Sequence, residues 1–312
     1  MTAIVTLTPN PAIDVWAAVD RVEPSRKLRC TALRRDPGGG GINVARVAKR
    51  LGADVAAVYP SGGVTGRLLR KLLDREEVAG RSVNLAEETR EDITISESST
   101  GQEYRFVMPG PPLAEAEWES ILALVSSFPA PPSYIVASGS LPPGVPDDFY
   151  ARAFRLGKEW GARAVVDASG NALKSALAEG VYLMKPNLRE FAELIGNPRP
   201  ADEACVKAAR GLIAEGRAQI VALTLGHRGA LLVSGDGAWR AAPLPITPMS
   251  RVGAGDSFLG GLISALAAGQ GLESAFRIAV AAGSAALLHT GTDLACAPDV
   301  ARLAGQVAIA PA

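Results

Sequence analysis

The sequence predicts an α/β protein with a mostly parallel central sheet and a small β-sheet lid. In the second half of the chain, short apolar runs alternate with segments of helical spacing, a pattern typical of parallel sheets covered by helices. In the first third, short β-like segments separate the core runs, which indicates a second piece of sheet. We therefore expect a single domain over residues 1–312, with the lid built from about 13–35 and 90–108.

The apolar runs of the second half predict buried strands, and each run ends in a polar, glycine-containing turn. The predicted strands are 134–137, 164–166, 181–184 and 220–225, and the helices between them are 147–159, 188–195 and 201–215. A longer apolar stretch at 275–288 contains Arg277 and falls short of the roughly 20 residues of a membrane span, so it predicts a buried helix. Because ligands of open α/β sheets bind where the strands end, the turns predict the site.

The first third combines core strands with lid strands. Residues 4–7 and 55–59 form apolar runs typical of the main sheet, whereas 13–19, 27–35, 92–98 and 103–107 are β-like segments that leave it and return. A lid of this kind usually closes over a substrate and excludes water from the reaction.

Composition and charge exclude several classes of protein. Basic and acidic residues number 32 each, so no net field attracts nucleic acid or an anionic membrane. The three cysteines are far apart and odd in number, which favours a reducing compartment, and the apolar run at 3–7 is too short for a signal peptide. We therefore expect a cytoplasmic protein. We expect no metal site built on histidine, because His227 and His289 have no Cys or acidic neighbours at ligand spacing.

The strongest local signal is the heptapeptide RVGAGDS at 251–257, which leads into an apolar helical run. Without side chains at Gly253 and Gly255, the backbone amides around Ala254 can approach an anion, and the helix N-terminus adds partial positive charge. Asp256 in the first turn is then placed to accept a hydroxyl proton while those amides stabilise a transferring phosphoryl group. The structural alternative is that Asp256 only caps the helix.

A second glycine cluster precedes another helix. The run PGGGGINVAR at 37–46 matches neither the P-loop nor the dinucleotide fingerprint, which also argues against a nicotinamide oxidoreductase. Bare backbone at Gly38 and Gly39 with Asn43 nearby favours a polyhydroxy ligand. A flexible turn is the alternative.

Four cations occur on the predicted lid segments. Lys27 and Arg29 are two residues apart, which on a strand places them on one face, and Arg90 and Arg105 stand on two further segments. Such a set suits a bound phosphate, because Arg offers paired hydrogen bonds and Lys a point charge. Solvated surface charges are the alternative.

Two turns of the second half carry polar residues suited to a nucleotide. In KPNLRE at 185–190, Asn187 and Glu190 face one way and suit Mg²⁺ held directly or through water, although an ordinary capping box fits as well. In TLGHRG at 224–229, two glycines close a strand, as in a turn that contacts phosphate or ribose.

Taken together and in this order, the motifs resemble the PfkB family of ribokinase-like sugar kinases over nearly the whole chain. The resemblance implies a ribokinase-like three-layer sandwich with ATP and a ketose phosphate as substrates. Within the family, the segments 27–32, 37–46, 104–110 and 138–145 are most similar to the type 2 bacterial 6-phosphofructokinases, which implies phosphorylation of fructose 6-phosphate at its 1-hydroxyl in glycolysis.

The resemblance also implies a role for each motif residue. Asp256 is the base, beside Gly253, Ala254 and Gly255. The residues implied to hold the sugar are Asp14, Gly38, Gly39, Asn43 and Gly139, with Lys27, Arg29, Arg90 and Arg105 around its phosphate. Those implied for ATP are Lys185, Asn187, Arg189, Thr224, Gly226 and Gly229, with Glu190 organising Mg²⁺ through water.

Family members often bind K⁺, here through backbone oxygens of Ser250, Val252, Ala286 and Gly291, although His289 and Asp293 stand where Asn and Arg are expected. The opening TPNPAID at 8–14 is also similar to 1-phosphofructokinases, so fructose 1-phosphate and tagatose 6-phosphate stay open as acceptors. A catalytically silent sugar-phosphate sensor is the alternative outside the enzymes. A homodimer formed through the exposed lid edge follows from the resemblance and from strand physics.

Overall fold

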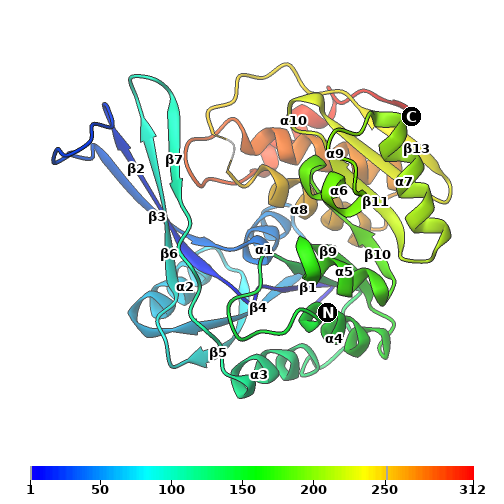
Figure 1. Cartoon of the computed structure of the whole chain (residues 1–312), viewed down its shortest axis with the longest axis horizontal. Helices are drawn as coiled ribbons and strands as arrows, with labels where there is room; N and C mark the ends of the chain where they lie inside the picture. The colour runs from blue at the N-terminus through cyan, green and yellow to red at the C-terminus, as the bar shows by residue number, and fades with distance from the viewer. Residues whose placement is uncertain (1, 251) are drawn as a thin grey trace.

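A large twisted sheet runs through the centre of the molecule (Figure 1). This computed structural model describes residues 2–250 and 252–312, so Arg251, the first residue of the RVGAGDS motif, lies outside the described residues. Across the sheet, the strands are β5 (Ala79–Leu85), β4 (Val55–Gly62), β1 (Ile4–Leu7), β8 (Tyr134–Ser138), β9 (Arg163–Asp167), β10 (Val181–Met184), β11 (Ala218–Thr224), β12 (Ala230–Ser234), β13 (Gly237–Ala241) and β14 (Ile309–Pro311). The pairs from β5 to β11 are parallel, and those from β11 to β14 are antiparallel.

Helices cover both faces of this sheet. One face packs against α1 (Gly40–Arg50), α2 (Gly63–Arg75), α8 (Ala254–Ala267), α9 (Leu272–Ala286) and α10 (Ala297–Ala304). The other packs against α3 (Glu115–Val125), α4 (Phe149–Lys158), α5 (Gly170–Ala178), α6 (Leu188–Ile195) and α7 (Asp202–Ala214). A 3₁₀ turn, η1 (Gly226–Arg228), follows β11.

Alternate residues of each central strand enter opposite cores. In β8, Val136 packs with the α8 side, whereas Ile135 and Ala137 pack with the α4 side. Both sets are buried, because side chains of a strand point alternately to the two faces and both faces are covered. This explains why the strands of the second half are continuous apolar runs, and it gives the three-layer sandwich that the resemblance implied.

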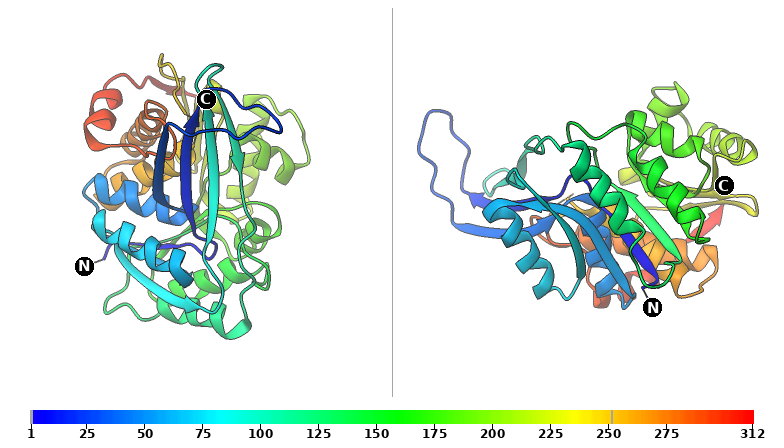
Figure 2. Two further views of the ribbon diagram at one scale, coloured as in Figure 1. Left: turned by 90° about the vertical axis from the view of Figure 1, so that its left-hand side faces the viewer. Right: turned by 90° about the horizontal axis from the view of Figure 1, so that it is seen from below.

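A separate small sheet projects from one side of the main body (Figures 1 and 2). Its strands, in order, are β3 (Ala32–Gly38), β2 (Ala12–Val19), β6 (Arg90–Glu97) and β7 (Gln102–Phe106). We call the sheet formed by these four strands the small sheet. Its position at the chain segments 12–38 and 90–106 agrees with the expected lid segments.

Register gives the small sheet two different faces. Asp14 lies opposite Asp36 on one neighbour and Asp92 on the other, and Arg105 pairs with Thr94 on the same face. The opposite face carries apolar residues in register, namely Ile13, Val15, Ala17, Leu33, Ile93, Ile95, Tyr104 and Phe106. Ile13 packs into the main core at the base, whereas Leu33 and Phe106 are 61% and 51% exposed near the outer end. The polar face is the one that carries the predicted site residues.

The predicted strand at 27–35 is wrong in its first half. Strand β3 begins at Ala32, which lies opposite Ala18, so residues before it would have to pair beyond the end of β2 at Val19. Lys27 and Arg29 therefore lie in the exposed connection between β2 and β3, where their spacing does not place them on one face of a strand.

The other expected elements are confirmed with small shifts at their ends. The strand at 181–184 and the helix at 188–195 match β10 and α6 residue for residue. The apolar stretch at 275–288 is largely α9, a buried helix, and among the described residues no helix is both long and apolar enough to cross a membrane.

Candidate active site

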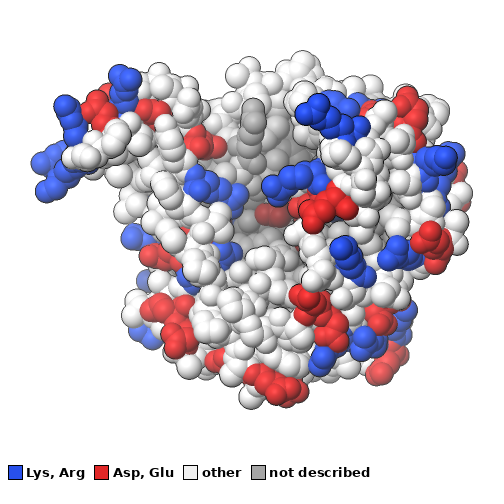
Figure 3. Space-filling model, viewed as in Figure 1, with Lys and Arg blue, Asp and Glu red and all other residues white. Residues whose placement is uncertain are grey.

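A hollow lies between the small sheet and the main body. Figure 3 shows this hollow from the side of Figure 1, with acidic atoms deep inside it and basic side chains near its mouth. The carboxyl ends of β1, β8, β9, β10 and β11 point toward the same region, as expected for a ligand site on an open α/β sheet.

Asp256 lies in the first turn of α8, but it does not cap that helix. The N-cap is Gly253, whose φ of 73° is left-handed and suits glycine, and Asp256 instead accepts a hydrogen bond from Asn43 Nδ2 at 2.9 Å. Burial raises the pKa of Asp256 above its ordinary value, although Asn43 and the nearby cations Lys185 and Arg105 oppose the shift. A carboxylate with a raised pKa is better suited to take a proton.

Asn43 is held in turn by a buried arginine. Arg46 donates to Asn43 Oδ1 at 3.3 Å and to the Pro37 carbonyl at 2.8 Å, while its Nε donates to Glu76 at 2.8 Å. Because the guanidinium can only donate, it fixes the amide of Asn43 with its oxygen toward Arg46 and its NH₂ group toward Asp256. Arg46 is thus a positioning residue that the motif reading did not single out.

The glycine cluster of the PGGGGINVAR run at 37–46 brings backbone close to the Asp14 side chain. A Cβ atom on Gly38 would lie 2.4 Å from Cγ of Asp14, and one on Gly39 would lie 2.8 Å from Thr8 and require a side chain at φ 108°. Gly139, at the end of β8, also has a positive φ of 109°, and its carbonyl accepts from the Tyr150 hydroxyl. Close approach of the Asp14 and Thr8 side chains therefore leaves no room for a side chain at Gly38 or Gly39.

Lys185 lies between Asp167 and the start of α8. Its Nζ lies 3.1 Å from Asp167 Oδ1 and 3.5 Å from where a Cβ on Gly255 would stand, so it lies beside the amides at the start of α8. Burial alone would lower the pKa of Lys185, but the carboxylates of Asp167 and Asp256 raise it, so the ammonium stays charged.

Asn187 and Glu190 form the capping box that was the alternative to metal binding. The Glu190 amide donates to Asn187 Oδ1 at 3.0 Å, and the Asn187 amide donates to Glu190 Oε2 at 2.9 Å. This leaves the second carboxylate oxygen of Glu190 for another partner. Arg189 is exposed beside them.

The turn after β11 lies directly beside this box. The Thr224 amide donates to the Pro186 carbonyl at 3.1 Å, and Thr224 and Asn187 form an isolated parallel β-bridge. Gly226 and Gly229 both have positive φ, and a Cβ on Gly229 would lie 2.1 Å from the Ala241 carbonyl. The two predicted nucleotide turns therefore form one surface.

The lid cations do not form a single cluster. Arg90 is paired with Asp92 at 3.0 Å and donates to the carbonyls of Asn10 and Met108. Arg105 lies on the polar face of the small sheet, close enough to lower the pKa values of Asp14 and Asp256. Within the described residues, no hydrogen bond or ion pair ties Lys27 or Arg29 to this group.

The backbone oxygens expected around a monovalent cation belong to neighbouring segments. Ser250 Oγ donates to the Gly291 carbonyl at 3.0 Å, and the Val252 amide donates to Ser250 Oγ at 3.2 Å. Ala286 is the last residue of α9 and precedes Gly291 by five residues in the chain. Arg251, between Ser250 and Val252, is outside the described residues.

Comparison with known proteins agrees with this geometry. Residues 6–299 match the pfkB family carbohydrate kinase profile. The chain belongs to this family. It is 42% identical over 299 residues to the ATP-dependent 6-phosphofructokinase isozyme 2 of Mycobacterium tuberculosis H37Rv, covering 96% of this chain and 88% of that one. It is 39% identical over 308 residues to the isozyme 2 of Escherichia coli K12, covering 97% and 98% of the two chains.

A 1-phosphofructokinase of Xanthomonas campestris is also related, at 33% identity over 84% of this chain and 83% of its own. Among solved structures, Escherichia coli phosphofructokinase-2 in complex with potassium superimposes with a TM-score of 0.93 at 38% identity, covering 98% and 99% of the two chains. The same protein in complex with fructose-6-phosphate gives a TM-score of 0.91 at 37% identity, with the same coverage. The ribokinase-like fold and membership of the pfkB family are thus confirmed.

Sequence reasoning missed Asp167. The residue directly follows the predicted strand at 164–166, where side chains at the carboxyl end of a parallel strand face the ligand crevice. The strand pattern therefore indicated that Asp167 lies at the carboxyl end of a strand. It was missed because Asp167 belongs to none of the glycine motifs.

The buried carboxylate of Asp14 gives a test of the site's electrostatics. Burial raises the pKa of Asp14 to about 6 from 3.8, so the folded protein binds more protons than the unfolded chain between about pH 4 and pH 6. The stability that Asp14 contributes must then fall as the pH rises through this window. We expect the free energy of unfolding of Asp14→Asn to rise by up to about 3 kcal/mol relative to that of the wild type as the pH goes from 4 to 7.5.

Urea unfolding of both proteins at several pH values measures this gain. Asp236→Asn, which changes an exposed carboxylate, is the control and should show no comparable trend. A constant difference between Asp14→Asn and the wild type across the window would contradict the assigned burial effect.

Proposed function

We propose that this chain is an ATP-dependent 6-phosphofructokinase that transfers the terminal phosphoryl group of ATP to the 1-hydroxyl of fructose 6-phosphate. The observation that carries the proposal is Asp256, held by Asn43 at the N-terminus of α8 and beside Lys185. A base, an anion-binding helix N-terminus and a cation lie together there, which is the set that phosphoryl transfer requires. The 6-phosphofructokinase relatives at 39–42% identity support the choice of acceptor.

In this proposal, Asp256 accepts the proton of the 1-hydroxyl as the oxygen attacks phosphorus. The amides at Gly253, Ala254 and Gly255 donate to the transferring group, and Lys185 balances the charge of the nucleotide phosphates. Since the small sheet lies along one side of the hollow, its movement over the hollow would exclude water from this centre (Figures 1 and 3).

The remaining motif residues supply substrate contacts. Asp14, Gly38, Gly39, Asn43 and Gly139 surround the place proposed for the sugar hydroxyls. Arg105 and Arg90 lie nearest the place proposed for the sugar phosphate. Lys27 and Arg29 would reach it from the exposed connection between β2 and β3 when the lid closes. Asn187, Arg189, Thr224, Gly226 and Gly229 form the proposed ATP surface.

Mg²⁺ fits the acidic groups beside Lys185. Glu190 keeps one oxygen outside its capping box, and Asp167 faces the same region, since each carboxylate affects the pKa of Lys185. The ion would supply charge neutralisation between the nucleotide phosphates. K⁺ fits the carbonyls of Ser250, Val252, Ala286 and Gly291, as the potassium complex of the related Escherichia coli protein suggests. With ATP and a sugar phosphate as substrates, we place the enzyme in glycolysis and in the cytoplasm.

Asp256→Asn tests the assignment of the base. We expect kcat to fall about 10²–10⁴-fold while the affinity for the sugar phosphate changes little, because the amide keeps the shape but cannot take the proton. Steady-state kinetics and a binding titration measure the two effects separately. Normal turnover in the variant would rule out Asp256 as the base.

A coupled assay of ADP release with ATP and Mg²⁺ tests the acceptor. We expect kcat/KM to be highest for fructose 6-phosphate among fructose 6-phosphate, fructose 1-phosphate, tagatose 6-phosphate and unphosphorylated fructose. Preference for fructose 1-phosphate or tagatose 6-phosphate would keep the mechanism and change the substrate. Binding without turnover on every sugar would favour the silent sensor.

The outer face of the small sheet is the proposed dimer interface. Leu33 and Phe106 expose apolar side chains there, and a second copy would cover them. We expect Leu33→Asp to shift the protein from dimer to monomer in sedimentation velocity. Val64→Asp, at a 66% exposed position on α2, is the matched control and should leave the dimer intact. A dimer that survives Leu33→Asp would count against this face.

A further inference from the structure

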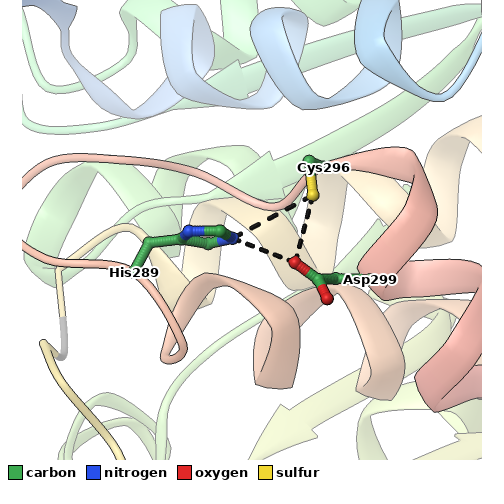
Figure 4. Close-up of side chains that lie close together, drawn as sticks. All are labelled: His289, Cys296 and Asp299. Carbon is green, nitrogen blue, oxygen red and sulfur yellow. Dashed lines mark hydrogen bonds and ion pairs between the residues drawn. The ribbon is translucent and has the colours of Figure 1, made fainter.

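Three side chains that can bind metal converge away from the proposed kinase site. His289 follows the end of α9, Cys296 is the N-cap of α10, and Asp299 lies one turn into that helix (Figure 4). The Nε2 atom of His289 and the Sγ atom of Cys296 each lie 3.2 Å from Asp299 Oδ2, and they lie 4.0 Å from each other. Among the described residues, this is the cluster whose histidine, thiol and carboxylate atoms gather closely enough to share an ion.

These separations are close to those of a tetrahedral zinc site. Bonds of about 2.3 Å to sulfur and 2.0–2.1 Å to nitrogen and oxygen place the ligand atoms about 3.3–3.6 Å apart around Zn²⁺. The observed distances lie on both sides of that range, so small side-chain rotations would suffice.

The set of donors selects the class of ion. A thiolate and an imidazole favour borderline metals such as Zn²⁺, whereas Mg²⁺ and Ca²⁺ favour oxygen ligands. Arg302 donates to the other oxygen, Asp299 Oδ1, at 2.6 Å, and so holds Oδ2 toward His289 and Cys296. Carboxylates that bind a metal ion are typically held by an outer-shell hydrogen bond of this kind.

We infer that His289, Cys296 and Asp299 form a binding site for a borderline divalent transition-metal ion such as Zn²⁺. The side chains of His289 and Asp299 are 30% and 23% exposed, so the ion can enter from solvent and a water molecule can complete the coordination. The sequence-based argument against a histidine-built metal site assumed that His289 has no Cys or acidic neighbours, and this assumption is wrong. The chain between residues 289 and 296 turns back, which brings Cys296 and Asp299 beside His289.

The site would join the two ends of a loop that is important for the proposed kinase centre. Residues 290–295 include Gly291, whose carbonyl accepts from Ser250, and Asp293, which pairs with Arg34 of the small sheet. A metal ion would therefore fix the end of α9 relative to the start of α10, directly beside this loop. The inference does not depend on the kinase proposal, since binding can be measured without turnover.

The test is metal binding by the full chain after chelator treatment under reducing conditions. Equilibrium dialysis with Zn²⁺ should give one tightly bound ion per chain, and Co²⁺ should give absorption from thiolate-to-metal charge transfer. Cys296→Ser and His289→Asn should each weaken binding more than about 100-fold, and Arg302→Gln about 10-fold, as for loss of an outer-shell partner. Circular dichroism checks that each variant is folded.

The chain offers matched controls for each ligand. Cys30→Ser and His227→Asn remove the exposed cysteine and the other histidine, and both should bind Zn²⁺ as the wild type does. Binding of less than one ion per chain would overturn the inference. So would a Co²⁺ complex without thiolate charge transfer, or Zn²⁺ affinity that survives in both folded variants Cys296→Ser and His289→Asn.

Discussion

The hydrogen bond between Asn43 and Asp256 is the contact on which the candidate site depends. It joins the first turns of α1 and α8, which lie 213 residues apart in the chain, so the two helix N-termini face the same hollow. The helices can approach this closely because Gly260 has no side chain: a Cβ there would lie 2.7 Å from Cβ of Val47. Any change that separates α1 from α8 would therefore move Asp256, the proposed base, away from Asn43.

The small sheet contributes to the site through the strict alternation of its strands. The same register that turns Asp14, Asp92 and Arg105 toward the hollow turns Leu33 and Phe106 outward. A slip of one residue would exchange the two faces, so that carboxylates would lie on the proposed dimer face and apolar groups over the place proposed for the sugar. The proposed substrate contacts and the proposed dimer face are thus two consequences of one pairing pattern.

The sequence predicted best where local pattern and tertiary environment agree. The strand at 181–184 is buried on both faces, and the helix at 188–195 begins with a capping box and ends at Gly196 in the left-handed conformation, so both boundaries could be read directly. It failed for Lys27 and Arg29, because a β-like run forms a strand only where a partner strand continues. Asp167 and Arg46 were missed because their roles come from neighbours distant in the chain, Lys185 for one and Glu76 for the other.

The loop after α9 shows how a departure from the family pattern is compensated. Asp293 stands where an arginine was expected, and it pairs with Arg34 at 3.2 Å and Arg50 at 3.5 Å. Burial alone would raise the pKa of Asp293, but the hydrogen bond and charge of Arg34 lower it, so the carboxylate stays ionised.

An arginine at this position would bring a third guanidinium beside Arg34 and Arg50, with Asp36 and Glu76 already engaged by arginines. The aspartate instead ties the loop to strand β3 of the small sheet through Arg34, and the Thr292 hydroxyl also donates to Asp36 on the same strand. The backbone of Gly291 packs against the indole of Trp16 on the same sheet. These contacts join the small sheet to the loop that carries the Gly291 carbonyl, one of the backbone oxygens proposed for K⁺.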